Sequence, residues 1–97
     1  MKIVAVTACP TGIAHTYMAA EQLAKTAKKL GHAIKVETQG AMGIENELTQ
    51  QDIDAAEVAI FATDIALERL ERFARIRTIE VPVQAALKNP DAIFAKI

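Results

Sequence analysis

The sequence predicts an α/β fold in which helices cover both faces of a four-stranded parallel sheet, giving three layers. Two apolar runs, at residues 3–6 and 58–62, are continuous rather than alternating, which is typical of central strands buried on both faces. Two further runs, at residues 33–38 and 78–81, carry charged side chains on one face, as edge strands do. Helical patterns separate the runs, so consecutive strands are expected to be parallel.

The first strand is followed by a predicted long helix that begins at Ile13. Apolar positions recur at helical spacing, and charged residues, mostly lysines, lie on the opposite side. The expected buried face consists of Ile13, Tyr17, Ala20, Ala24, Ala27 and Leu30. Gly31 is expected to end this helix, because glycine accepts the left-handed backbone of a C-terminal cap.

The segment 39–48 is expected to be a loop between the second strand and a short helix. Thr49 and Asp52 have the spacing of a capping box, in which two side chains satisfy helix-terminal N–H groups. The helix that they begin is expected to end near Ala56.

Three helices are expected after the third strand. Asp64 is the expected N-cap of a helix that runs through Phe73. Pro82 is expected to begin a helix through Lys88, because proline suits the first turn. Pro90 starts a last short helix that is expected to reach the end of the chain.

Right-handed crossovers between these strands place helices on both faces of the sheet. With the two apolar strands central, the strand order is 2-1-3-4, which is a Rossmann-like arrangement. This order reverses direction between the first and third strands, and ligands of such sheets bind at the carboxyl ends of the strands at that point. The loops that begin at Cys9 and Asp64 are both expected there.

Cys9 is the only cysteine in the chain and stands between the first strand and the first helix. The unpaired N–H groups and the dipole of a helix N-terminus favour an anion such as phosphate. The same field favours the thiolate, which is the nucleophilic form of cysteine. Gly12 lets the loop approach an anion, and Thr11 and Thr16 each offer a hydroxyl. The alternative is that Cys9 is a small core residue.

Other polar residues at the same edge have two interpretations each. His15 stands where a phosphatase loop of the C-x5-R type has its arginine, and a single imidazole cannot fork to two oxygens, so phosphate is expected to be held without strong hydrolysis. It is otherwise an exposed residue of the first helical turn. Asp64 is a general acid or a helix cap. Gln39 and Gly40 serve protein docking or merely connection.

Composition limits the classes of function. The 97 residues suit one domain, and 52% are apolar, 24% charged and 4% aromatic. Few aromatic residues and a net charge of −1 argue against nucleic acid and anionic membranes as partners. No membrane-spanning run or signal peptide is recognised, so a cytoplasmic chain is expected. One cysteine and two distant histidines predict no metal site, and no cofactor motif occurs.

The segment from Thr7 to Glu21 resembles the signature of fructose-type enzyme IIB of the bacterial phosphoenolpyruvate-dependent sugar phosphotransferase system. The similarity includes residues 36–40 and 62–65 and covers nearly the whole chain. It implies a single IIB domain, residues 1–97, with a fold like that predicted above. It also implies a phosphate-binding turn made by Pro10, Thr11, Gly12, Ile13, Ala14, His15 and Thr16.

The resemblance further implies a protein-phosphohistidine–sugar phosphotransferase. Cys9 would accept a phosphoryl group from a phosphohistidine of the IIA component and pass it to fructose or a fructose-like sugar held by the membrane component IIC. The chain would then work in the cytoplasm, at the inner face of the membrane through IIC. Two other classes stay open on the residues alone: a cysteine phosphatase or arsenate reductase, and a non-catalytic module in which Cys9 is dispensable.

Overall fold

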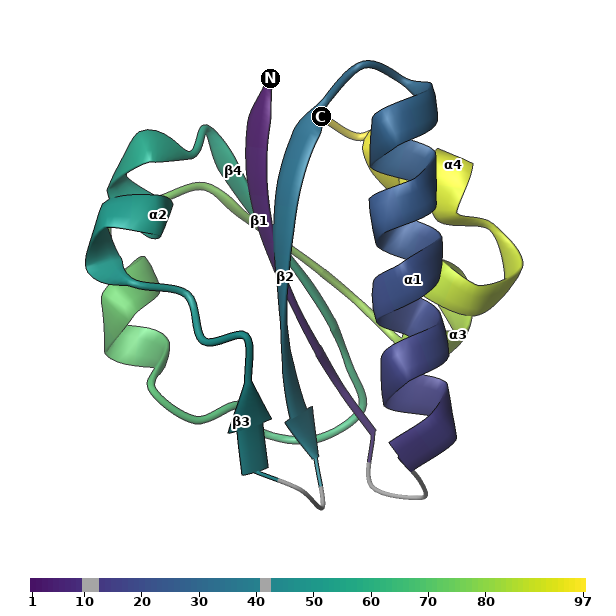
Figure 1. Cartoon of the computed structure of the whole chain (residues 1–97), viewed down its shortest axis with the longest axis horizontal. Coiled ribbons are helices and arrows are strands. Elements are labelled where there is room, and N and C mark those ends of the chain that lie inside the picture. The colour runs from purple at the N-terminus through teal and green to yellow at the C-terminus, as the bar shows by residue number, and fades with distance from the viewer. Residues whose placement is uncertain (10–12, 41–42) are drawn as a thin grey trace.

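The computed structural model describes residues 1–9, 13–40 and 43–97, which form a five-stranded sheet with helices on both faces (Figure 1). The elements are β1 (Lys2–Ala8), α1 (Ile13–Lys29), β2 (Ala33–Gly40), β3 (Gly43–Glu45), α2 (Gln50–Ala55), β4 (Val58–Thr63), the 3₁₀ helix η1 (Leu70–Phe73), β5 (Thr78–Val81), α3 (Val83–Lys88) and α4 (Pro90–Phe94).

The strand order is β3-β2-β1-β4-β5, and every pair is parallel except the antiparallel pair β2–β3. The four expected strands thus occur in the expected order, as β2-β1-β4-β5. The prediction of a purely parallel, four-stranded sheet is wrong, because part of the expected loop 39–48 pairs with the end of β2, Thr38 opposite Glu45. A strand of three residues is too short for its periodicity to be recognised in a sequence.

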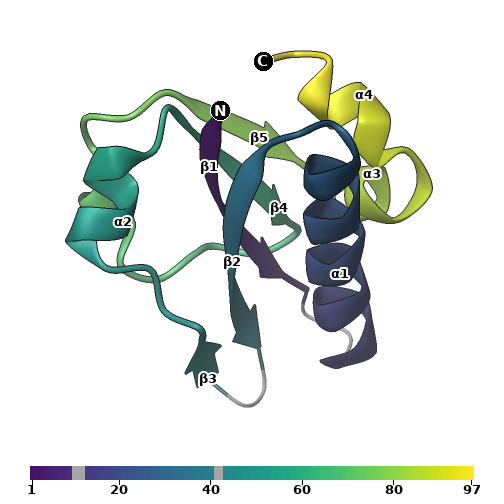
Figure 2. The same ribbon diagram turned by 45° about the horizontal axis from the view of Figure 1, so that its top comes forward.

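The sheet separates two hydrophobic cores (Figures 1 and 2). Helices α1, α3 and α4 cover one face, and α2 and η1 cover the other. Ile3 and Ala5 of β1 join the core on the α1 side, whereas Val4 and Val6 join the core on the α2 side. The prediction that β1 is buried on both faces is therefore confirmed.

The buried face of α1 differs from the expected one. Tyr17 and Leu30 are 38% and 47% exposed, although both were expected inside. The buried positions on this helix are Thr16, Ala19, Leu23, Thr26 and Ala27. Ala27 is buried as predicted, but the rest of the buried stripe lies about one position away from the expected one, because two buried threonines do not count toward an apolar stripe.

Gly31 ends α1 as predicted. Its φ is +83°, its N–H donates to the Lys28 carbonyl at 3.1 Å, and the N–H of His32 donates to the Ala27 carbonyl at 2.8 Å. These two bonds define a Schellman cap, which needs a left-handed residue at the position of Gly31.

The start of α2 is also confirmed. The hydroxyl of Thr49 accepts from the Asp52 N–H at 3.1 Å, and the Asp52 carboxylate accepts from the Thr49 N–H at 2.9 Å. The predicted starts at Pro82 and Pro90 correspond to α3 and α4, although α4 ends at Phe94.

The predicted helix over residues 64–73 is wrong except for its last turn, η1. The Asp64 carboxylate accepts from the N–H of Val83, the first residue of α3, at 3.2 Å and so caps a different helix. Tertiary contacts override local helix propensity here, because the side chain of Gln39 in β2 forms hydrogen bonds with both the N–H and the carbonyl of Glu68.

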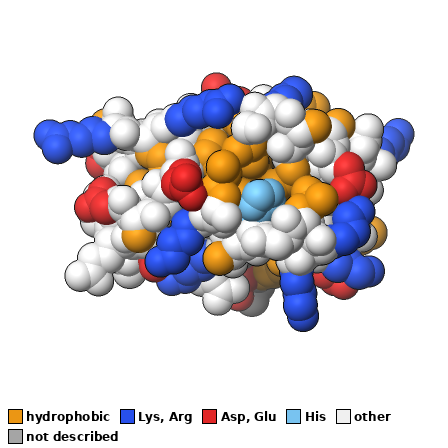
Figure 3. Space-filling view, turned by 90° about the horizontal axis from the view of Figure 1, so that it is seen from above, with side chains coloured by type: hydrophobic (Ala, Val, Ile, Leu, Met, Phe, Trp, Pro, Cys, Tyr) orange, Lys and Arg blue, Asp and Glu red, His pale blue; other side chains and the backbone are white. Residues whose placement is uncertain are grey.

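Both chain termini lie at the same end of the molecule (Figure 1). Figure 3 looks onto this end, where apolar side chains surround a histidine and charged side chains of both signs lie around them. None of the helices in the described part of the chain combines the length and apolarity that crossing a bilayer requires.

Candidate functional site

Cys9 directly follows β1, at the carboxyl edge of the sheet, and α1 begins at Ile13. Its side chain is 8% exposed and packs with the core on the α1 side. The positive end of a 17-residue helix therefore lies close in sequence to the thiol. The predicted order of strand, cysteine and helix is confirmed.

The first turn of α1 is tied to the end of β1. The Thr7 hydroxyl donates to the Thr16 carbonyl oxygen at 3.0 Å in the interior. Thr16 is 2% exposed, and within residues 1–9, 13–40 and 43–97 its Oγ1 has no hydrogen-bond partner. A Cβ on Gly40 would lie 3.9 Å from this oxygen, so Gly40 and Thr16 are neighbours. A buried hydroxyl without a partner is unusual and is available to a ligand.

The remaining residues of the predicted turn fall into two groups. Ala14 and His15 are exposed in the first turn of α1, and Ile13 is its first residue. Pro10, Thr11 and Gly12 lie outside the described residues, so the expectations for them stay predictions.

The end of β4 lies beside the end of β1, as the predicted topology requires. The Asp64 N–H donates to the Ala8 carbonyl at 3.2 Å, which places Asp64 next to the strand that carries Cys9. Its carboxylate is engaged by the Val83 N–H. The interpretation of Asp64 as a helix cap is thus correct in kind, although the helix is α3.

A buried charged network behind this edge is missing from the sequence interpretation. Glu37 was expected on the wetter face of an edge strand, yet it is 0% exposed. Its Oε1 and Oε2 accept from Nη1 and Nη2 of Arg72 at 2.8 and 3.0 Å, a bidentate ion pair. The Leu48 N–H and the Gln39 Nε2 also donate to Glu37, each at 2.8 Å.

The pKa of Glu37 reflects two opposing effects. Burial favours the neutral acid, but the hydrogen bonds from Arg72, Gln39 and the Leu48 backbone outweigh it and hold the pKa below its ordinary value of 4.5. Glu37 is therefore ionised at neutral pH. The sequence offers one signal, a charged residue next to polar neighbours in a strand, but nothing in it pairs Glu37 with a residue as distant as Arg72.

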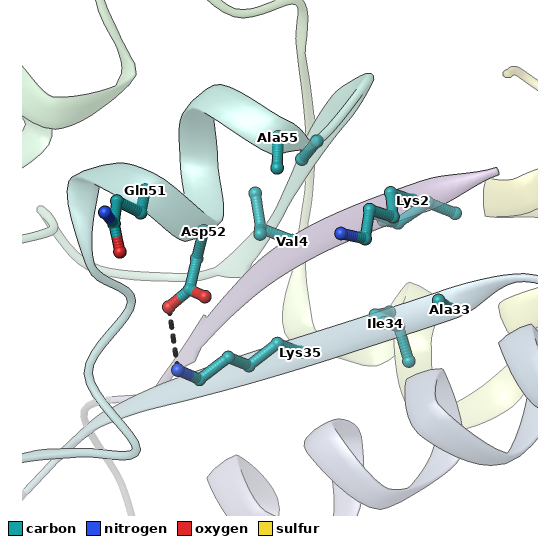
Figure 4. Close-up of a pocket in the computed structure, with 10 residues that line it drawn as sticks. Lys2, Val4, Ala33, Ile34, Lys35, Gln51, Asp52 and Ala55 are labelled. Carbon is teal, nitrogen blue, oxygen red and sulfur yellow. Dashed lines mark hydrogen bonds and ion pairs between the residues drawn. The ribbon is translucent and has the colours of Figure 1, made fainter.

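A separate groove of about 260 Å³ lies between α2 and the amino-terminal parts of β1 and β2 (Figure 4). Lys2 lines it, so it is remote from Cys9 at the other end of β1. Lys35 donates to the Asp52 carboxylate at 2.7 Å across the groove. Lys35, followed by the backbone and hydroxyl of Thr49, lowers the pKa of Asp52 to about 2.

No group of three or more His, Cys, Asp or Glu side chains in the described ranges is arranged to hold a metal ion.

Comparisons with known proteins agree with this architecture. Residues 4–96 match the family model described as "PTS system, Lactose/Cellobiose specific IIB subunit". The chain is 52% identical over 96 residues to the "PTS system fructose-like EIIB component 2" of Escherichia coli K12, covering 99% of this chain and 91% of that protein. It is also 52% identical over 95 residues to the "PTS system fructose-specific EIIABC component" of Bacillus subtilis, covering 98% of this chain and 15% of that longer protein.

A solved structure shows the same fold. The crystal structure of a domain of the fructose-specific IIABC component of Borrelia burgdorferi superposes with a TM-score of 0.92 at 47% identity, over 97% of this chain and 89% of that one.

Proposed function

Because the chain belongs to the IIB subunits of the sugar phosphotransferase system, we propose that Cys9 is its phosphoryl carrier. The observation that carries the proposal is the position of Cys9 between the carboxyl end of β1 and the N-terminus of α1. Oriented N–H groups and the helix dipole stabilise both a thiolate and a phosphoryl group at such a place.

In the first transfer, the thiolate of Cys9 attacks the phosphorus of a phosphohistidine on a IIA component. The S–P bond forms while the N–P bond breaks, and the electron pair of that bond stays on the ring nitrogen. The ring carries a proton on its other nitrogen, so it leaves as neutral imidazole. In the second transfer, a hydroxyl oxygen of the sugar attacks the same phosphorus. The O–P bond forms, the thiolate leaves, and the hydroxyl proton passes to a base or to water.

The partners of the proposal are a IIA donor and a membrane IIC component that holds fructose or a fructose-like sugar. Relatives named EIIABC join IIB to such components in one chain. We place the exchange in the cytoplasm, at the inner face of the membrane where IIC lies. Neither transfer needs a cofactor.

We assign the phosphate-binding turn to Pro10, Thr11, Gly12, Ile13, Ala14, His15 and Thr16. Within it, Thr16 is supported by its buried hydroxyl, which has no partner in the part of the chain that the structure describes. A phosphoryl oxygen would satisfy that hydroxyl. Asp64 is assigned a structural role, since its carboxylate caps α3.

Phosphorylation of the purified chain tests the proposal. With phosphoenolpyruvate, the general phosphotransferase proteins and a fructose-type IIA, the wild type should gain one phosphoryl group, and mass spectrometry of its peptides should locate it on Cys9. Cys9→Ser should take up none, because a serine hydroxyl without a neighbouring base stays protonated and is a far poorer nucleophile.

Thermal unfolding of Cys9→Ser is the control and should match the wild type closely. A label on His15, a label that persists in Cys9→Ser, or rapid hydrolysis of p-nitrophenyl phosphate by the wild type would contradict the carrier role.

A further inference from the structure

The side chain of Gln39 joins β2 to the segment that follows β4. Its Oε1 accepts from the backbone N–H of Glu68 at 2.8 Å, and its Nε2 donates to the backbone carbonyl of the same residue at 3.0 Å. Only asparagine and glutamine carry a carboxamide, in which a donor and an acceptor lie side by side on one carbon, and asparagine is one methylene shorter. Gln39 therefore binds the backbone at residue 68 as a neighbouring strand would.

The buried ion pair orients this amide. Nε2 of Gln39 also donates to Oε2 of Glu37 at 2.8 Å, and Glu37 is itself held by both terminal nitrogens of Arg72. Gln39 is 5% exposed, so water competes little for these bonds. The carboxylate thus fixes which way the amide faces.

Residues 64–69, here called the edge segment, are held at their start by β1 and α3. The Asp64 N–H donates to the Ala8 carbonyl, and the Asp64 carboxylate accepts from the Val83 N–H, both at 3.2 Å. The Thr63 hydroxyl accepts from the Ile65 N–H at 3.1 Å, which closes a turn at the same point.

The far end of the edge segment is held as firmly. Beyond the two bonds from Gln39, Nε of Arg72 donates to the Arg69 carbonyl at 2.8 Å. Arg69 has a φ of +61°, a left-handed conformation that is unfavourable for a residue with a Cβ and persists where neighbours impose it.

These contacts place the edge segment beside Cys9. Ala8 is opposite Gln39 on one side and opposite Thr63 on the other. Ala8 lies between them and has only a methyl side chain. The Gln39 amide therefore extends across the end of β1 and contacts the segment that follows β4. The edge segment crosses the carboxyl edge next to Cys9 and exposes Ile65 there, at 39%.

We propose that Gln39 is a positioning residue for phosphoryl transfer, because it fixes the edge segment as the part of the rim on which the phosphoryl donor docks. The proposal rests on the carrier role of Cys9. The thiol is packed against the core on its inner side, so a donor must cover the rim at the carboxyl edge to reach it. A segment that is ordered before the encounter spares the complex the entropy of ordering it.

The test is the steady-state transfer rate as a function of the concentration of phosphorylated fructose-type IIA. Gln39→Ala should raise KM for this donor about tenfold, as expected for the loss of about 1.4 kcal/mol of binding, and should leave kcat within about twofold. The rate at which iodoacetamide alkylates Cys9 should stay unchanged, because the bonds of β1 remain.

Gln50→Ala is the matched control. Gln50 also donates its amide to a backbone carbonyl, that of Arg72 at 3.1 Å, but it belongs to α2 and its other bond is to Asp54. Gln50 is exposed, so its loss should lower thermal stability less than the loss of Gln39, and it should leave KM for the donor unchanged. Gln39→Met keeps the length and apolar burial of the side chain and should reproduce the KM effect if Gln39→Ala does not fold.

Hydrogen exchange of the wild type needs no variant. The amide of Glu68 should be protected, although its residue is exposed. Exchange of that amide at the rate of a free peptide would overturn the inference, as would a wild-type KM in a folded Gln39 variant or an equal rise in Gln50→Ala. A wild type that takes no phosphoryl group would instead overturn the carrier role itself.

Discussion

Glu37 is a charged residue in the interior of the protein, where Arg72 is its counter-ion. Its alternation with Val36 assigns it correctly to the other face of β2, but the same pattern is typical of a wet face. That face is covered by η1, and Arg72 of η1 binds Glu37 although the two residues are far apart in the sequence. The face was predictable, and its burial was not.

Replacing Glu37 by Gln should destabilise the protein by about 3 kcal/mol, because it leaves the buried guanidinium of Arg72 without its counter-ion. Urea unfolding at pH 7 measures this. Lys29→Gln, which breaks the exposed pair Lys29–Asp91, should cost far less. Equal losses in the two variants would show that burial adds nothing to the pair.

The same substitution should change the response to acid. In the folded state the pKa of Glu37 lies below its ordinary value of 4.5, so the unfolded chain takes up the proton first. The stabilisation is therefore complete above that value and is lost as the pH falls through the folded pKa. The free energy of unfolding should therefore fall less steeply between pH 5 and pH 2 in Glu37→Gln than in the wild type.

Cys9 gave a stronger signal than Glu37. Its position between an apolar strand and a helix was readable from local patterns alone, and the structure has that order. Gln39 was expected on the same edge, where it would serve protein docking or merely connection. Its partner Glu68 lies in a segment that the sequence predicts as a helix. Because that prediction is wrong, the contact between Gln39 and Glu68 could not be predicted.

At the scale of elements, caps were predicted best. The capping box at Thr49 and the glycine cap at Gly31 use residues that are neighbours in sequence, so a local pattern is sufficient. The expected helix over residues 64–73 and the missed strand β3 both depend on what lies across the sheet. Local propensity has no access to that information.

Gly31→Ala should lower the free energy of unfolding by about 1 kcal/mol, because a Cβ disfavours the φ of +83° that the cap of α1 needs. Nothing lies within 4 Å of the added methyl group, so the loss would come from the backbone alone. Gly31→Asn should lose less, since asparagine tolerates this conformation. A larger loss for Asn than for Ala would contradict the cap.

At the scale of the whole molecule, the sheet couples two cores. β1 supplies alternate side chains to both, with Ile3 on one side and Val4 on the other. If either layer of helices unfolded, the apolar side chains on one face of β1 would become exposed to water. The prediction of a doubly covered sheet followed from the continuous apolar runs and the right-handed crossovers, which is why the architecture was predicted better than its edges.

Cooperative unfolding should follow from this shared sheet. Leu23→Ala in one core and Phe73→Ala in the other should each cost about 3 kcal/mol, since both side chains are buried. The denaturant dependence of the unfolding free energy should stay the same in both variants. NMR signals from the two cores should vanish in a single transition, and two separate transitions would show that the layers unfold independently.

Both chain ends leave the molecule on the side remote from Cys9. β1 runs from Lys2 toward Cys9 over roughly 20 Å, so the N-terminus lies at the opposite edge of the sheet from the thiol. Arg77 directly precedes β5, a strand of the same parallel set, and therefore lies at the edge where β1 begins. Arg77 donates to the Lys96 carbonyl at 2.9 Å, which places the C-terminus at that edge too. Figure 1 shows the two termini together. A tag or surface linkage at either end therefore points away from the thiol. The chain can be immobilised on a sensor through Met1 or Ile97 while the reactive edge faces the solution.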